Sequence, residues 1–187
     1  MAYKARRPAI KGSVRQRRAP SSSALPLSKK SKVVGIGELA VLAVNGRLVT
    51  YALGSCVGIV GYDRSRKIAG LLHVLLPQSK SDLSQPNRNP AAYANTGVPA
   101  LVLAMQRLGG DPMASRFHLA GGASMLKTSA PLDVGRRNVM AVRKALWNAG
   151  LFVQAEMVGG HEPRSLTIDA ATGVVSVQIP GRPEVTL

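Results

Sequence analysis

The feature that most constrains the fold of this chain is a series of short apolar runs, beginning near residue 33, that turn residues separate from one another. The first two runs, at 38–44 and 47–53, are rich in β-forming residues and are joined by Asn45-Gly46. Asn-Gly between two such runs is the strongest short-range signal for a β-hairpin. Two further runs flank the charged segment 63–66 and predict a second hairpin.

Two segments between the strands predict helices. Before Gly109-Gly110, apolar residues recur at helical spacing: Val98, Leu101, Val102, Met105 and Leu108. The segment 135–148 predicts a second, amphipathic helix, with Val139, Val142 and Leu146 on one stripe.

Further strands complete the predicted fold. We expect a buried strand at 116–122, a further strand at 151–158, and a third hairpin over 165–179 that turns at 171–173. Strands with two interposed helices and mostly hairpin connections predict an α+β (mixed α/β) fold, with residues 33–187 forming a single domain.

The first 32 residues differ in composition from the rest of the chain. They hold ten Lys and Arg residues and no acidic residue, so the net charge of +16 falls to +6 over the remaining residues. Prolines and a run of three serines leave too little apolar content to fold, and we expect residues 1–32 to form a disordered basic tail. Such a tail is either a solvated extension or a binding arm attracted to phosphate or carboxylate surfaces, including peripheral contact with a membrane.

Several classes of protein are disfavoured by composition. Cys56 is the only cysteine, and together with His73, His118 and His161 it gives none of the paired spacings of a structural zinc site. We therefore expect no metal. No run of about 18 apolar residues appears, and residues 1–32 lack the apolar segment of a secretory signal, so we expect a cytoplasmic protein.

Cys56 lies in the second predicted hairpin, directly after Gly54 and Ser55. A tight turn centred between Arg64 and Ser65 would place Cys56 directly opposite His73. Opposing Cβ atoms lie about 4.5–5.5 Å apart, so an imidazole nitrogen would reach the sulfur. A thiolate–imidazolium pair would then lower the cysteine pKa from about 8.5 to as little as ~3–4 and create a nucleophile with its own acid/base.

Gly54 and Ser55 predict that Cys56 lies where a bend meets a strand. Thr50 lies on the strand leading into that bend, and its hydroxyl could orient His73 as the third group of a triad. The alternative interpretation is structural, because free cysteine is among the most buried residue types and a lone histidine is usually structural. Spacing alone leaves both interpretations open.

Several sequence segments together carry a family resemblance. TYALGSCVGIVGYD is followed, 17 residues after the cysteine, by HVLLP; then come YANTGVPALVLAM, AGGASML, GRRNVMAVRKAL and VGGHEPRSLTIDAATGVVSV. In this colinear order, over about residues 34 to 180, they resemble the CheD family, the chemoreceptor glutamine deamidases of bacterial chemotaxis.

The resemblance implies hydrolysis of glutamine side chains to glutamate in methyl-accepting chemotaxis receptors, through a Cys-His-Thr triad and without a cofactor. It places the nucleophile on Cys56, the acid/base on His73 and the orienting hydroxyl on Thr50. It implies packed mixed β-sheets flanked by helices, a fold resembling the cytotoxic necrotizing factor deamidases. It also implies action at receptor clusters and a CheC-type phosphatase as a second partner.

Three rival functions remain. A nucleic-acid-binding protein would explain the charge, but only 4% of residues are aromatic and no binding motif is present, so we expect no specific nucleic-acid partner. A non-catalytic adaptor would keep the fold and bind a CheC-type phosphatase. A transglutaminase would share the thioester intermediate and differ in accepting an amine in place of water.

Overall fold

The structure is a computed structural model that describes residues 31–79, 89–124 and 133–187. Most of the expected basic tail, residues 1–30, and much of the expected polar loop, residues 80–88, lie outside the described residues.

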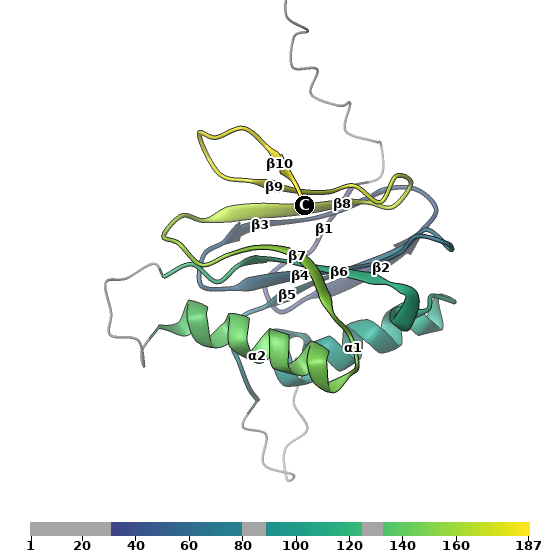
Figure 1. Cartoon of the computed structure of the whole chain (residues 1–187), viewed down its shortest axis with the longest axis horizontal. Coiled ribbons are helices and arrows are strands. Elements are labelled where there is room, and N and C mark those ends of the chain that lie inside the picture. Colours follow the sequence, from purple (N-terminus) through teal and green to yellow (C-terminus); the bar gives the residue numbers. More distant parts are fainter. Residues whose placement is uncertain (1–30, 80–88, 125–132) are drawn as a thin grey trace, which may run out of the picture.

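Two mixed β-sheets pack face to face (Figure 1). The first sheet consists, in order across the sheet, of β1 (Ser31–Val33), β3 (Arg47–Leu53), β8 (Arg164–Asp169), β9 (Val175–Gln178) and β10 (Val185–Thr186). The second sheet consists, in order, of β2 (Leu39–Ala43), β5 (Ile68–Val74), β4 (Val57–Asp63), β6 (Arg116–Gly121) and β7 (Val153–Val158). Each sheet has one parallel pair, β1 with β3 and β6 with β7, and its other pairs are antiparallel.

Two helices, α1 (Ala94–Arg107) and α2 (Val134–Asn148), cover the face of the second sheet that points away from the first (Figure 1). Short 3-10 helices at Pro90–Ala92 and Pro112–Ala114 flank α1. The second sheet is therefore the middle of three layers, and every residue of β4 and β5 is buried. Strand β8 instead alternates between buried and half-buried residues, as expected for a sheet with one covered face.

The core has two parts, one on each face of the second sheet. Between the sheets, Leu48 and Leu166 pack with Val60 and Leu71. Between the second sheet and the helices, the cluster includes Val98, Leu101, Met105, Val142 and Leu146. The α+β fold class, both helices, the strand at 116–122 and the hairpin of β8 with β9 are as the sequence predicts.

The hairpin predicted across Asn45-Gly46 is wrong. A turn does form there, but β2 pairs with β5 in the second sheet, whereas β3 pairs with β1 and β8 in the first. Val44 and Gly46 both have positive φ, 69° and 112°, and the chain crosses between the layers at this point. Turn residues predict a local reversal of the chain, but they do not predict which sheet each strand joins.

The second hairpin forms with a different register from the predicted one. Asp63 pairs with Ile68, so the loop has four residues, 64–67, and His73 faces Gly58 rather than Cys56. The Asp63 carboxylate accepts hydrogen bonds from Ser65 Oγ and from the backbone and side chain of Arg66, which stabilises this wider turn.

Two residues that we assigned to the tail lie in the first sheet. Ser31 and Lys32 belong to β1 and pair with Arg47 and Leu48 of β3. In the described part of the chain, no helix is both long and apolar enough to cross a membrane.

Candidate functional site

Thr50 and His73 meet between the two sheets. Thr50 comes from β3 of the first sheet and His73 from β5 of the second, and both are almost completely buried. Thr50 Oγ1 lies 2.7 Å from His73 Nδ1, a hydrogen-bonding distance. The structure therefore brings together the two residues that we expected to form an orienting contact.

Cys56 lies where the chain passes from one sheet to the other. The bend at 54–56 connects the end of β3 to the start of β4. Just before it, the pairing of β3 with β8 is irregular between Thr50 and Leu53, and Ala52 has a φ of 55°. The hydroxyl on β3 and the thiol after the bend therefore border the same space between the sheets.

Cys56 is a diagonal neighbour of His73 and not its direct partner, which corrects the predicted register. Gly58 faces His73, and Cys56 lies two residues before Gly58. Cys56 lies in the bend directly before β4, and its side chain packs in the core between the sheets, where His73 also meets Thr50. Diagonal neighbours lie about 7–8 Å apart, within reach of long side chains.

One ring nitrogen of the imidazole makes no hydrogen bond within the described part of the chain. His73 Nε2 is buried and has no hydrogen-bond partner among the residues that the structure describes. The Cys56 side chain packs in the core between the sheets and is 8% exposed. The free ring nitrogen and the thiol therefore both lie between the sheets without a hydrogen bond between them.

Burial shifts the pKa of both groups. It raises the pKa of the Cys56 thiol above its ordinary value, against a smaller lowering by the Cys56 backbone N–H. Burial also lowers the pKa of His73. Both shifts favour the neutral forms, so this geometry does not favour the thiolate–imidazolium pair that we expected from the sequence. The physical reason is that desolvation acts on both groups while no direct hydrogen bond offsets it.

Two glycines at the end of β6 hold the bend that carries Cys56. Gly122 N–H donates to Cys56 O and Ala123 N–H donates to Gly54 O, each at 2.7 Å. Gly121 has a φ of 104°, and a Cβ there would lie 2.3 Å from Cys56 O. We did not predict this role, although paired glycines directly after a buried strand are a signal of close backbone approach.

A third contact to the bend comes from α2. Asn138 Nδ2 donates to Ser55 O at 2.8 Å and to Leu75 O at 2.9 Å. From the sequence we expected only that Asn138 belongs to the helix predicted at 135–148. The available signal was a polar side chain adjoining the apolar stripe of Val139 and Val142.

The other two histidines make separate contacts. His118 lies on β6 opposite Val60, and His161 Nδ1 contacts Ser124 O at 2.9 Å. Within the described ranges, no three His, Cys, Asp or Glu side chains are grouped so that they could hold a metal ion.

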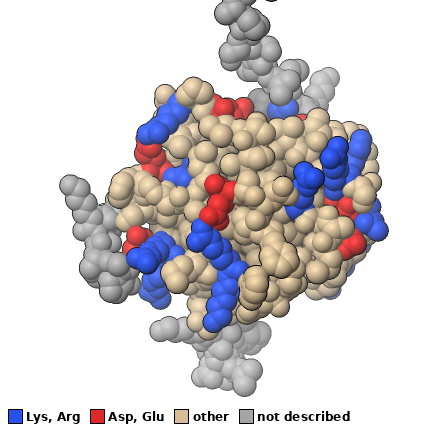
Figure 2. Space-filling view, viewed as in Figure 1, with Lys and Arg blue, Asp and Glu red and all other residues tan. Residues whose placement is uncertain are grey.

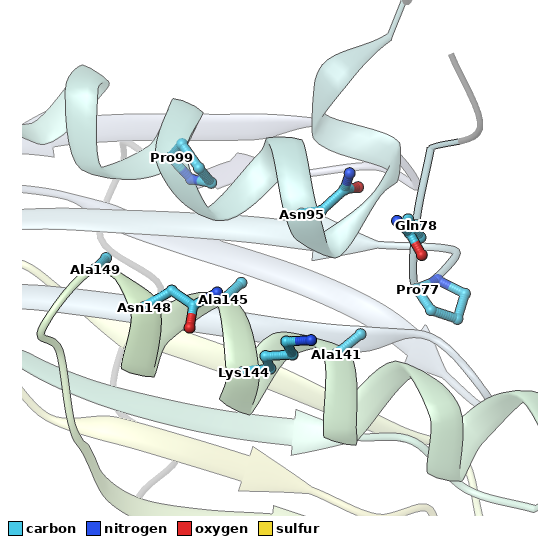
Figure 3. A pocket seen from close by; sticks show the side chains of 9 residues that line it. All are labelled: Pro77, Gln78, Asn95, Pro99, Ala141, Lys144, Ala145, Asn148 and Ala149. Atoms are coloured by element: carbon cyan, nitrogen blue, oxygen red, sulfur yellow. The ribbon is translucent and has the colours of Figure 1, made fainter. Parts of the chain in front are cut away.

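Two surface cavities lie near the helices. One, of about 510 Å³, lies between side chains of α1 and α2, and Figure 3 shows Asn95 and Pro99 on one side of it and Lys144 and Asn148 on the other. The other, of about 530 Å³, borders Gly122, which bonds Cys56 O, and is also lined by Arg136 and His161. None of the residues lining either cavity is Thr50, Cys56 or His73.

The fold defines the class of this protein, and a comparison with known families identifies its family. The fold is that of an α+β protein with two stacked mixed sheets, and a family model described as "CheD chemotactic sensory transduction" matches residues 75–179. The chain belongs to the CheD family.

Curated relatives agree with this assignment. A protein of Syntrophotalea carbinolica is 39% identical over 153 residues, which cover 80% of this chain and 94% of the relative. A protein of Desulforamulus reducens is 41% identical over 155 residues, covering 80% of this chain and 91% of the relative. A protein of Thermococcus kodakarensis is 40% identical over 147 residues, covering 78% of this chain and 90% of the relative. All three are named "Probable chemoreceptor glutamine deamidase CheD".

Proposed function

We propose that this protein is a chemoreceptor glutamine deamidase that converts glutamine side chains of methyl-accepting chemotaxis receptors to glutamate. Family membership and the names of the relatives support this activity. The observation that carries the assignment of the site is the hydrogen bond between Thr50 and His73. It holds an imidazole with a free Nε2 between the two sheets, where the side chain of Cys56, the only cysteine in the sequence, also packs.

The proposed base is His73 Nε2. For this atom to accept a proton, Nδ1 must carry the ring hydrogen and donate it to Thr50 Oγ1. Burial lowers the pKa of His73, so the ring is neutral and its Nε2 lone pair is available at neutral pH. Thr50 therefore acts on the reaction through His73, because it selects the tautomer and orients the ring.

Catalysis begins from a neutral thiol. His73 Nε2 accepts the Cys56 proton as the sulfur attacks the glutamine Cδ, so the thiolate forms only when the substrate is present. The carbonyl oxygen becomes an oxyanion, which the Cys56 backbone N–H and a neighbouring donor stabilise. The imidazolium then gives its proton to the leaving nitrogen, and the C–N bond breaks to release ammonia and leave a thioester.

Hydrolysis completes the cycle. Water attacks the thioester while His73 accepts one of its protons, the C–S bond breaks, and the thiol is restored as glutamate forms. The net reaction consumes one water and releases one ammonia for each glutamine. No redox step occurs.

Replacement of the proposed nucleophile tests this function. Receptors co-expressed with the wild-type protein should gain the mass that accompanies replacement of an amide by a carboxylate, and purified receptor fragments should release ammonia. Cys56→Ala and Cys56→Ser should abolish both signals, whereas His161→Ala, which alters an exposed histidine, should retain them. Activity near that of the wild type in Cys56→Ala would refute the mechanism.

Thr50 provides a graded test of the triad. Thr50→Val keeps the shape of the buried side chain but removes the hydroxyl, so we expect kcat to fall by about ten- to a hundredfold, less than on loss of His73. Thr50→Ser keeps the hydroxyl and should retain most of the activity. Equal activity in the two variants would mean that the hydrogen bond does not orient the base.

Two further experiments address the rival functions. A CheC-type phosphatase is the second partner that we propose, and binding to it should survive in Cys56→Ala because docking does not need the thiol. An added primary amine should not become incorporated into the receptor if water is the acceptor, whereas incorporation would indicate a transglutaminase.

A further inference from the structure

Asn138 is a buried polar residue in an apolar layer. It lies on the buried face of α2, has no exposed surface, and is flanked along the helix by Val139 and Val142. A buried amide loses its hydration and is tolerated when protein groups replace the lost hydrogen bonds. The hydrogen bonds of Asn138 therefore indicate why a polar residue occupies this buried position.

Both hydrogens of Asn138 Nδ2 are used, and each holds the end of a different strand. One bonds Ser55 O, directly before Cys56, and the other bonds Leu75 O, two residues after His73. One side chain from the helix layer thus ties the bend before β4 to the end of β5. These are the two segments that carry Cys56 and His73.

The bond to Ser55 O also controls the direction of a backbone donor. Ser55 C=O and Cys56 N–H belong to one peptide unit, and the chain has no cis peptide bond within its described residues. A trans peptide is planar, with its C=O and N–H pointing in opposite directions. When Asn138 holds the oxygen of this unit, it also sets the direction in which Cys56 N–H points.

Asn138 does not form all the hydrogen bonds that its side chain could form within the described residues. Asn138 Oδ1 is buried and has no hydrogen-bond partner among the described residues. An unpaired buried acceptor is unfavourable for stability, so the two bonds from Nδ2 are kept at a cost to the fold.

We propose that Asn138 is a positioning residue that orients the Cys56 backbone N–H toward the oxyanion of the reaction. This role rests on the proposed function, in which that N–H stabilises the oxyanion. Asn138 itself touches neither the substrate nor the sulfur. Its contribution should appear in reactions that build up negative charge on a carbonyl oxygen and should be much smaller in reactions of the thiol that do not.

Two reactions of the same cysteine separate these cases. Deamidation passes through an oxyanion, whereas alkylation of Cys56 by iodoacetamide displaces iodide and forms none. Asn138→Ala should lower kcat for deamidation by about ten- to a hundredfold, with KM little changed; this is less than the ~10²–10³-fold cost of removing an oxyanion donor, because the N–H itself remains. Alkylation should slow by much less than deamidation, because the Cys56 N–H makes only the smaller of the two contributions to the thiol pKa.

Variants in α2 provide matched controls. Val142→Ala removes buried methyl groups one turn further along the same helix and leaves both hydrogen bonds intact. It should lower the Tm but not kcat. Asn138→Ser keeps one hydroxyl donor in a smaller side chain and should have an intermediate kcat, so it carries the test if Asn138→Ala does not fold.

A direct readout of the peptide unit does not depend on activity. Because Cys56 is the only cysteine, labelling with [15N]cysteine gives one amide resonance, which reports the environment of Cys56 N–H. Asn138→Ala and Asn138→Ser should shift or broaden this resonance, and Val142→Ala should leave it near its wild-type position. If the wild-type protein deamidates no receptor fragment, the proposed function fails, and the resonance alone decides whether Asn138 orients the N–H.

Two outcomes would overturn the proposal. One is an unmoved Cys56 resonance together with unchanged kcat in the Asn138 variants. The other is a loss of alkylation as large as the loss of deamidation, which would show that Asn138 affects the thiol itself rather than the backbone donor.

Discussion

The local environment of Cys56 disfavours the charged form of its thiol. The thiol and the His73 ring both lie between the two sheets, and burial favours the neutral form of each. The side chain opposite His73 is absent because residue 58 is glycine, and a Cβ there would lie 2.9 Å from Leu53 Cδ1 and Leu166 Cδ2. The close packing of first-sheet side chains on this strand contributes to the burial of both groups, which accounts for the direction of both pKa shifts.

This environment makes a prediction about thiol chemistry. Because burial raises the pKa of Cys56, alkylation by iodoacetamide should slow by about tenfold for each pH unit below the ordinary cysteine pKa of about 8.5. The rate should still be rising with pH where the rate for the urea-unfolded chain has levelled off. Mass spectrometry of the alkylated protein measures both profiles. A rate that stays constant down to about pH 6 would reveal a preformed thiolate.

Among the strands and helices, the ends of β5 and β6 and the helix α2 fix the position of the bend that carries Cys56. Strand β6 ends in Gly121, and Gly122 and Ala123 then bond the backbone on both sides of Ser55. Strand β5 ends near Leu75, which Asn138 ties to the same bend. The backbone of the bend that carries Cys56 is thus held by residues directly after β6 and by α2, although Cys56 belongs to neither element.

Glycine substitution tests the contact from β6. Gly121→Ala introduces a Cβ at 2.3 Å from Cys56 O in a residue with a φ of 104°, so steric overlap adds to backbone strain. We expect it to lower the free energy of unfolding by more than about 3 kcal/mol.

Gly109 is a matched control for this substitution. It also has a positive φ, 90°, but a Cβ there meets nothing within 4 Å. Gly109→Ala should therefore cost only about 1 kcal/mol, from strain alone. Urea unfolding of both variants measures the difference, and equal losses would mean that contact with Cys56 O is unimportant.

At the scale of the whole molecule, positive charge is distributed unevenly along the chain. Residues 1–32 carry ten basic side chains and no acidic one. On the face seen in Figure 2, Lys and Arg side chains are scattered and several have acidic side chains beside them. Pairs such as Arg47 with Asp169 and Arg182 with Glu162 neutralise part of the charge of the folded region.

We propose that the basic segment tunes encounter with the receptor and takes no part in the chemistry. A truncated protein should begin at Ser31, because β1 belongs to the first sheet. It should turn over a small glutamine peptide at the wild-type rate. Its deamidation of intact receptors in membranes should be slower, most clearly at low ionic strength, since exposed charges are screened over about 8–10 Å at ordinary salt.

The outcome of the truncation distinguishes three cases. Equal impairment on peptide and receptor would place the segment within the active fold. Unchanged activity on receptors at every salt concentration would make it a solvated extension. Slower deamidation of receptors but not of soluble receptor fragments would point to anionic lipid headgroups as the surface that the segment contacts.

Much of the local structure follows from the sequence because its causes lie within a few residues. Apolar residues at helical spacing predict α1 and α2, and the turn at 171–173 predicts the hairpin of β8 with β9. Cys56 and His73 also both lie between the sheets, although the predicted register is wrong by two residues.

Only the tertiary structure decides what depends on distant partners. Asn45-Gly46 predicts a turn, but the assignment of β2 and β3 to different sheets depends on β5 and β8, far along the chain. Thr50 and His73 are 23 residues apart and come from opposite sheets, and Asn138 bonds Ser55 across 83 residues. The raised pKa of the Cys56 thiol is likewise a consequence of desolvation by burial. Periodicity and turn chemistry act over a few residues, whereas sheet pairing and burial are collective properties of the packed chain.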